Sequence, residues 1–277
     1  MRAAHIYTQI SGSNYRTDAQ CIFNETNINE LQCTIYAVMI EKNIFQSWHT
    51  TNLNPLVQHQ IDFFKNLNPE YKYNLYTDDD MDNFVNEHFP GVISECYNKL
   101  NIIVAKVDLW RYLVLYKYGG VYLDMDSGIT KPLNTLITND DEAIITAEGN
   151  PNMYVQWGLI FSKQHPILKK TIELVCDNII TNAYPNDIHK MTGPAVYSRA
   201  INEVHRELFN KTINHAGINK NTDITYKSNN TSYRVYGIDY NNYFCFKHCF
   251  AHLLFNGKIH WKQEEKTKKL LKTAGHA

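Results

Sequence analysis

The stretch that decides the fold is Ala105–Asp126, which reads AKVDLWRYLVLYKYGGVYLDMD. Apolar side chains recur at helical spacing from Ala105 to Tyr118, which predicts an amphipathic helix. The two glycines that follow are typical of a helix C-terminus. Val121–Leu123 then predicts a short buried strand that ends at Asp124-Met125-Asp126. In open α/β sheets ligands bind at the carboxyl ends of strands, so this strand places two carboxylates at a ligand-binding edge.

Asp124 and Asp126 are two residues apart, so an extended backbone directs both side chains to one side. Two neighbouring carboxylates repel each other, and each raises the pKa of the other. A hard divalent cation removes that conflict, because Mg²⁺ and Mn²⁺ prefer oxygen ligands. Such a cation also neutralises the charge of a departing diphosphate. The alternative is an Asx-type turn that carries two solvated acids.

The sequence on both sides of this stretch predicts an α/β fold, because strand and helix patterns alternate along it. The predicted strands are 43–48, 71–76, 121–123, 143–146, 155–161 and 234–238. The predicted helices are 55–67, one that begins at 77–80, 105–118, 166–180 and 194–208. Residues 210–230 are rich in Asn and are predicted to form a loop, and Lys-rich residues 262–272 an exposed helix or tail.

The overall composition excludes several function classes. The chain of 277 residues has 27 basic and 28 acidic side chains, a formal net charge of −1. A protein that binds nucleic acid would be expected to have a basic surface. No apolar run approaches the roughly 20 residues of a membrane span, and the N-terminus lacks the apolar core of a secretory signal. The six scattered cysteines then predict free thiols in a reducing compartment.

The domain organisation expected from these patterns is simple. Residues 1–40 are polar and weakly patterned, so we expect an N-terminal extension that packs on the main domain. Residues 41–277 are expected to form a single domain.

Several ordered motifs carry a resemblance to a known family. The central block comprises Lys106, Asp108, Arg111, Leu115, Tyr116, Tyr118, Gly119, Gly120, Tyr122, Leu123, Asp124 and Asp126. Further blocks are NIFQSW at 43–48, LNPE at 67–70, YNLYTD at 73–78, FSKQHPI at 161–167 and TGP at 192–194. Together they resemble glycosyltransferase family 32, the sugar-binding glycosyltransferases with a DXD motif. Its relatives include the yeast initiating α-1,6-mannosyltransferase, α-1,4-galactosyltransferases and the clostridial glucosylating toxins.

The resemblance implies a GT-A fold, which is a Rossmann-like α/β/α sandwich with a mixed central sheet. It implies transfer of a hexose from a UDP- or GDP-sugar to a glycan, lipid or protein acceptor, with retention of anomeric configuration. It also implies a Mn²⁺ or Mg²⁺ cofactor.

The resemblance assigns roles to the central block. Asp126 would coordinate the metal, and Asp124 would contact the ribose or the metal shell. Asp108 and Arg111, one helical turn apart, would hold the hydroxyls and diphosphate of the donor. The alternative for this pair is an intrahelical salt bridge. Tyr122 belongs to the same nucleotide-sugar site.

Other site residues lie away from this block. Trp48 would stack near the nucleotide base, with a core position as the alternative. Gln156 falls where relatives carry an amide near the reacting carbon. Near the C-terminus, His260 or His252 would supply a third metal ligand, with Trp261 close to the donor. The remaining candidates of this segment, Cys245, His248 and Cys249, are core residues or, with His252, ligands of a structural zinc.

Two other function classes remain open. A haloacid-dehalogenase-type phosphatase also has a D-x-D at a strand end, with one Asp as nucleophile. A catalytically inactive glycan-binding protein would keep the fold without the reaction. The favoured interpretation is a cytoplasmic glycosyltransferase from a bacterium or large virus, with no nucleic-acid partner.

Overall fold

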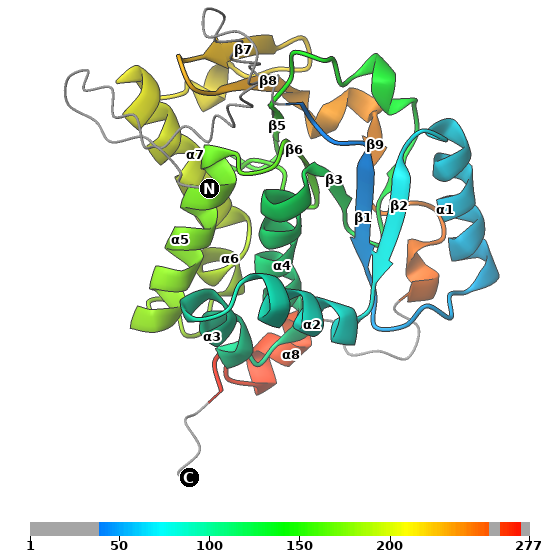
Figure 1. Ribbon diagram of the computed structural model, residues 1–277, viewed down its shortest axis with the longest axis vertical. Coiled ribbons are helices and arrows are strands. Elements are labelled where there is room, and N and C mark those ends of the chain that lie inside the picture. Colours follow the sequence, from blue (N-terminus) through cyan, green and yellow to red (C-terminus); the bar gives the residue numbers. More distant parts are fainter. Residues whose placement is uncertain (1–38, 255–260, 273–277) are drawn as a thin grey trace, which may run out of the picture. The chain divides into compact units, whose positions relative to one another are not determined.

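The computed structural model describes residues 39–254 and 261–272. The predicted packing of the N-terminal extension falls on residues 1–40 and so lies almost wholly outside this range. The described chain forms a seven-stranded mixed sheet in the order β2-β1-β3-β6-β5-β8-β7, with helices on both faces (Figure 1). The expected α/β sandwich with a mixed central sheet is therefore confirmed.

The strands of this sheet are β1 (Asn43–Ser47), β2 (Lys72–Tyr76), β3 (Gly120–Leu123), β5 (Ala143–Ala147), β6 (Gly158–Phe161), β7 (Asp223–Lys227) and β8 (Ser232–Ile238). A small second sheet pairs β4 (Gly128–Ile129) with β9 (Phe244–Cys245). The helices are α1 (Pro55–Leu67), α2 (Asp78–His88), α3 (Val92–Lys99), α4 (Ile103–Tyr118), α5 (Pro166–Thr181), α6 (Ile188–Met191), α7 (Pro194–Phe209) and α8 (Trp261–Thr267).

The strand directions bring the carboxyl ends of five strands to one side of the sheet, which is called the binding edge below. β1 runs parallel to β2 and β3, and β5 runs parallel to β8. β6 is antiparallel to both β3 and β5, so β3 and β5 point the same way. The carboxyl ends of β1, β2, β3, β5 and β8 therefore meet at one edge, which is where open α/β sheets bind ligands.

Two hydrophobic cores lie on opposite faces of the sheet, because alternate side chains of each strand point to opposite faces. Phe45 and Tyr122 pack in the core beneath α4, α5 and α7. Ile44 and Val121 pack in the other core, against α1 and the β4–β9 segment. A one-residue shift of either strand would exchange the two cores, so this alternation sets the register.

The junction between α4 and β3 depends on glycine at two successive positions. Gly119 has φ +63° and Gly120 φ +120°, in the region that side chains disfavour. A Cβ on Gly119 would lie 2.0 Å from Oε2 of Glu41, and one on Gly120 would lie 2.6 Å from the carbonyl oxygen of Asn43. The glycines thus let the chain end α4 and enter β3 against the neighbouring strand.

The structure confirms most of the expected elements and corrects others. Residues 210–230, predicted to be a loop, contain the edge strand β7. The strand expected at 155–161 begins only at Gly158, because Val155 bonds with Thr146 and the chain turns before β6. α3 was not predicted. The capping of α2 by Thr77 and Asp80 is as expected from the Thr-Asp-Asp-Asp run.

Two predictions from composition can be examined in the part of the chain described. Cys96, Cys176, Cys245 and Cys249 are free thiols, as expected. None of the helices within 39–254 and 261–272 is both long and apolar enough to cross a membrane.

Candidate functional site

Asp124 and Asp126 lie directly after β3, at the carboxyl edge of the sheet, as predicted. Both side chains are partly exposed, whereas Met125 between them is buried. The Asp124 amide donates to the carbonyl of Trp157 at 2.8 Å, and the Ser127 amide donates to the carbonyl of Asp124 at 2.9 Å. Backbone bonds on both sides thus hold the two carboxylates at the edge.

Arg111 joins Asp108 on α4 to Asp124 at the end of β3. Its Nη2 lies 3.1 Å from Oδ1 of Asp108 and 3.2 Å from Oδ1 of Asp124. The guanidinium is buried, with 3% of its side chain exposed, and lies over the ring of Tyr122. Tyr122 Oη donates to Oδ1 of Asp124 at 2.6 Å. The intrahelical salt bridge is therefore present, and Asp124 extends it.

Asp108 is surrounded by protein groups on both of its oxygens. Gln156 Nε2 donates to Oδ1 at 2.9 Å, and Thr192 Oγ1 donates to Oδ2 at 2.9 Å. Gln156 Nε2 also donates to Tyr112 Oη at 2.8 Å, and the backbone carbonyl of Gln156 accepts from Nη1 of Arg111 at 3.2 Å. The structure thus brings Asp108, Arg111 and Gln156 together as buried groups, and Arg111 links them to the partly exposed Asp124.

Two positioning residues were not among the predicted site residues. Gln46 on β1 is fully buried and donates to the carbonyl of Asp124 at 3.0 Å, while its Oε1 accepts from Tyr73 Oη at 2.9 Å. Thr192 holds Asp108. A polar Gln inside an apolar strand and the Thr-Gly-Pro block are signals that could have identified both, because a buried polar side chain requires a partner.

The electrostatics of the two carboxylates favour a bound cation. Burial raises the pKa of Asp124 to about 6; Arg111 opposes this shift and Asp126 adds to it. Burial also raises the pKa of Asp126, and Lys247 opposes that shift. At neutral pH the edge therefore carries two poorly solvated carboxylates whose charge a cation would stabilise.

The residues present suit a divalent cation in part. Carboxylate oxygens of Asp124 and Asp126 are the hard ligands that Mg²⁺ and Mn²⁺ prefer, and such ions usually keep waters and substrate phosphates in their shell. Within 39–254 and 261–272, however, no three His, Cys, Asp or Glu side chains gather as a metal site. The donor set thus fits a cation that phosphate oxygens complete.

The C-terminal candidates gain no support as ligands. His252 is exposed and its Nδ1 contacts the carbonyl of Cys249 at 3.0 Å. The zinc alternative would need Cys245, His248, Cys249 and His252 together, a set that the described ranges do not contain. His260 lies outside the described residues. Trp261 begins α8, and its side chain is likewise outside the description.

Lys247 and His248, which follow β9, lie against Asp126. The His248 amide donates to the carbonyl of Asp126 at 2.8 Å. Lys247 adopts φ +54°, an uncommon conformation for a residue with a side chain, and its charge acts on Asp126. Trp48 lies at the carboxyl end of β1, half-buried beside His49, so it shares the binding edge.

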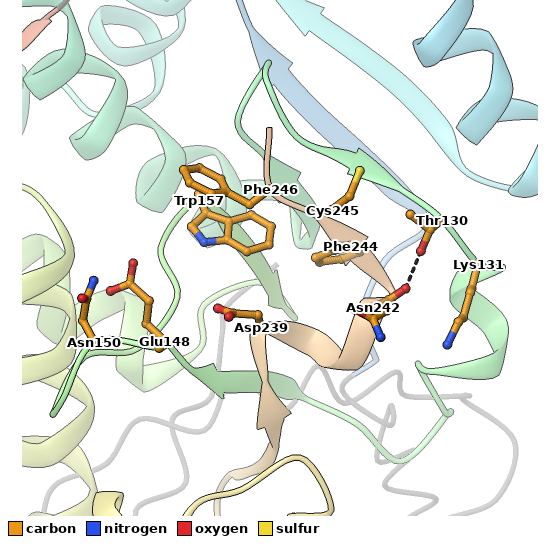
Figure 2. A pocket seen from close by; sticks show the side chains of 11 residues that line it. Thr130, Lys131, Glu148, Asn150, Trp157, Asp239, Asn242, Phe244, Cys245 and Phe246 are labelled. Carbon is orange, nitrogen blue, oxygen red and sulfur yellow. Dashed lines mark hydrogen bonds between the residues drawn. The ribbon is translucent and has the colours of Figure 1, made fainter. Parts of the chain in front are cut away.

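A cavity of about 740 Å³ adjoins this edge beside Trp157. Figure 2 shows its wall, formed by Trp157 and Phe246 on one side and by Glu148 and Asp239 on another. The Trp157 carbonyl binds the amide of Asp124, so the cavity and the carboxylate edge share one residue.

Comparison with known proteins finds a similarity to a described family in the part of the chain that contains this edge. Residues 41–143 match the family described as "Glycosyltransferase sugar-binding region containing DXD motif". This match contains Asp108, Arg111, Asp124 and Asp126, and it confirms the resemblance found in the sequence.

Two proteins that are similar in sequence to this chain are named as mannosyltransferases. Inositol phosphoceramide mannosyltransferase 3 of Schizosaccharomyces pombe is 30% identical over 162 residues, which cover 57% of this chain and 43% of the relative. The initiation-specific alpha-1,6-mannosyltransferase of Candida albicans is 23% identical over 179 residues, 55% of this chain and 46% of the relative. The matched part thus spans less than half of these relatives. A solved structure, PaToxG Glycosyltransferase, is 21% identical with a TM-score of 0.49 and covers 62% of this chain and 72% of that one.

Proposed function

Because residues 41–143 carry the sugar-binding region of the DXD glycosyltransferases, we propose that this protein is a metal-dependent, retaining GT-A glycosyltransferase. It would transfer a hexose from a UDP- or GDP-sugar to a glycan, lipid or protein acceptor. The supporting observation is the pair of partly exposed carboxylates, Asp124 and Asp126, held beside the buried cation of Arg111. The mannosyltransferase names of the relatives make mannose a candidate hexose.

In the proposed reaction, the bond between C1 of the hexose and the diphosphate oxygen breaks, and its electron pair leaves with the diphosphate. The acceptor oxygen forms a bond to C1 on the same face, and its proton passes to the released phosphate. Bound Mn²⁺ or Mg²⁺ would neutralise negative charge on the diphosphate. Asp126 and Asp124 would hold this cation.

The residues of the chain prepare the site before the donor binds. Arg111, Tyr122 and Gln46 fix the position of Asp124 from three elements, so little reorganisation is needed when charge develops. Lys247 adds positive charge next to Asp126, where the diphosphate would leave. Trp48 lies at the neighbouring strand end, where a nucleotide base could stack.

The test is nucleotide release from a panel of UDP- and GDP-hexoses with Mn²⁺, Mg²⁺ or EDTA. We expect one donor to be cleaved with metal only, and Asp126→Asn to lower the rate by about 100-fold or more. Asp140→Asn, at an exposed position, is the matched control and should keep the rate of the original protein. The anomeric configuration of the product, read by NMR, tests retention.

The same assay separates the alternatives. A phosphatase would hydrolyse p-nitrophenyl phosphate and ignore nucleotide sugars. Its nucleophile would have to be free, whereas Oδ1 of Asp124 already contacts Arg111 and Tyr122. An inactive glycan-binding protein would bind a donor with metal and release no nucleotide with any acceptor. The cytoplasmic location and the bacterial or viral source stay predictions.

A further inference from the structure

One end of the main sheet is formed by β7, which among the described residues pairs only with β8 (Figure 1). All residues of β7 except Tyr226 are exposed. The side of β7 that faces away from β8, the outer edge, therefore presents a row of backbone amides and carbonyls to a possible partner. Such an edge can pair with a strand of another chain.

The hydrogen bonds between β7 and β8 decide which backbone groups lie on the outer edge. In an antiparallel pair every second residue bonds to the neighbouring strand, and the residues between them point their amides and carbonyls away. The Gly237 amide donates to the Thr222 carbonyl at 2.8 Å, in register with the pairing of the two strands. Even-numbered residues of β7 thus bond to β8. Asp223, Thr225 and Lys227 direct their backbone groups to the outer edge.

The sequence of β7, Asp-Ile-Thr-Tyr-Lys, is complementary to itself. Two antiparallel copies that meet at Thr225 place Asp223 of each copy opposite Lys227 of the other. The same register places Ile224 opposite Tyr226. Pairs of opposite charge, and pairs of an aromatic with a β-branched side chain, are cross-strand pairs that stabilise sheets. The residues whose backbone groups lie on the outer edge also meet one another in this register, as hydrogen bonding between the copies requires.

Other arrangements of two copies lack this match. A parallel arrangement in register would place Asp223 beside Asp223 and Lys227 beside Lys227, and like charges opposite each other destabilise a sheet. A shift by one residue would set outward backbone groups against residues that already bond to β8. At the other end of the sheet, two antiparallel copies of β2 would place Lys72 opposite Tyr76, with no charge pair.

An exposed apolar side chain on the same strand supports the pairing. Ile224 is 48% exposed. Tyr226, on the same face of β7, packs beside the rings of Phe209 and Tyr233. In the paired register each Ile224 lies beside Tyr226 of the other copy, so burial of this side chain adds to the association.

The two charged residues of β7 are available for pairing with a second copy. The Asp223 side chain is 51% exposed, although its Oδ2 lies 3.5 Å from Nη1 of Arg234. Lys227 is exposed, and within 39–254 and 261–272 it has no ion pair. Both charges can therefore gain a partner without losing one.

We propose that β7 is the interface of a homodimer, in which two copies of the chain join their sheets antiparallel about a twofold axis at Thr225. Five residues a side lie well below the roughly 20–30 of a standard interface, so the dimer is weak and dissociates on dilution. The same patch serves both copies, so the contact closes on itself and builds no larger assembly. This inference does not depend on the proposed function.

The test is sedimentation velocity on the full chain from about 5 to 500 μM, a range that covers weak association. We expect the sedimentation coefficient to rise with concentration. Asp223→Lys or Lys227→Asp should each weaken association by about tenfold or more, because each sets like charges opposite each other. An equimolar mixture of the two variants should associate as well as the original protein, because every cross-strand charge pair is then of opposite sign. Asp140→Lys makes the same charge change at an exposed position outside β7, and this control should leave association unchanged.

Thr225→Pro tests the backbone pairing separately from the charges. The Thr225 amide points away from β8, so proline removes an outward donor and keeps the bonds to β8, as is tolerated on edge strands. This variant should not associate, whereas Thr225→Ala should. Circular dichroism shows whether each variant is folded.

Three results would overturn the inference. The chain could stay monomeric at about 500 μM, well above the concentrations at which micromolar complexes form. It could form a dimer that neither charge variant weakens, which would place the interface elsewhere. Finally, the mixture of the two charge variants could associate no better than either variant alone, which would exclude pairing of Asp223 with Lys227.

Discussion

Nη2 of Arg111 lies 3.2 Å from Oδ1 of Asp124, which ties the middle of α4 to the first acid after β3. The same nitrogen lies 3.1 Å from Asp108. One buried cation therefore serves two carboxylates, and the geometry of the binding edge depends on a side chain that is itself almost inaccessible.

Replacing Arg111 by Met is expected to lower the free energy of unfolding by about 3–5 kcal/mol, because it leaves buried Asp108 without a cation. Urea denaturation measures this loss. Lys169→Met, which breaks an exposed pair with Glu173, is the control and should cost less than about 1 kcal/mol. Adding Asp108→Asn to Arg111→Met should recover part of the stability. Equal, small losses for Arg111→Met and Lys169→Met would show that the buried pair contributes little.

Thr192→Val keeps the shape of the side chain and removes the hydroxyl that donates to Oδ2 of Asp108. We expect a loss of about 1–3 kcal/mol in unfolding free energy, because a buried carboxylate oxygen loses its donor. Thr181→Val removes an exposed hydroxyl and should change stability by less than about 0.5 kcal/mol. If Thr192 positions Asp108 for catalysis, kcat for nucleotide release should also fall with little change in donor KM. Unchanged stability and kcat would contradict this role.

Gly119→Ala is expected to destabilise the protein by about 2 kcal/mol or more, because it places a Cβ at positive φ. That Cβ would also lie 2.8 Å from the amide nitrogen of Lys163. Gly149→Ala is the control, since a Cβ on Gly149 would meet no heavy atom within 4 Å and the backbone there has no positive φ. The midpoints of thermal unfolding give the comparison, and similar midpoints for the two variants would refute the steric argument.

His165 predicts a pH dependence of stability. It is 2% exposed, caps α5 by accepting from the Ile167 amide, and burial lowers its pKa to about 4. The unfolded chain, with an ordinary His pKa near 6.5, binds more protons between these values. The contribution of neutral His165 to the free energy of unfolding is therefore fully present above about pH 6.5. It is lost as the pH falls towards 4, and the loss amounts to roughly 3 kcal/mol. His165→Asn, which can still cap the helix, should flatten the urea-denaturation profile over this range; an unchanged slope would exclude His165 as its cause.

Much of the fold follows from local patterns. The helix at 103–118, the two glycines and the strand at 120–123 form a continuous signal of periodicity and capping that depends on residues close in sequence. The edge strand β7 was missed because its exposed sequence is rich in polar residues. β7 forms because its backbone pairs with β8, and its own side chains do not show the alternation that would predict a strand.

Part of the candidate site could also be predicted from the sequence. Asp124 and Asp126 were placed at a strand end from adjacent residues alone. Gln156 was assigned near the reacting carbon, and this assignment stays a prediction; in the structure its amide donates to Asp108. This contact joins residues 48 positions apart, and no local pattern contains the direction of such a side chain.

The sequence by itself determined that a helix, two glycines and a strand deliver two acids to the edge of an α/β sheet. Hydrophobic periodicity and glycine conformations are properties of neighbouring residues, so they can be read along the chain. Only the tertiary structure decided that Arg111 serves both Asp108 and Asp124, and that Glu148 and Asp239 meet in one cavity. Those contacts depend on the strand order, which brings distant segments together. The strand order in turn depends on the balance, over the whole chain, between apolar burial and lost conformational entropy.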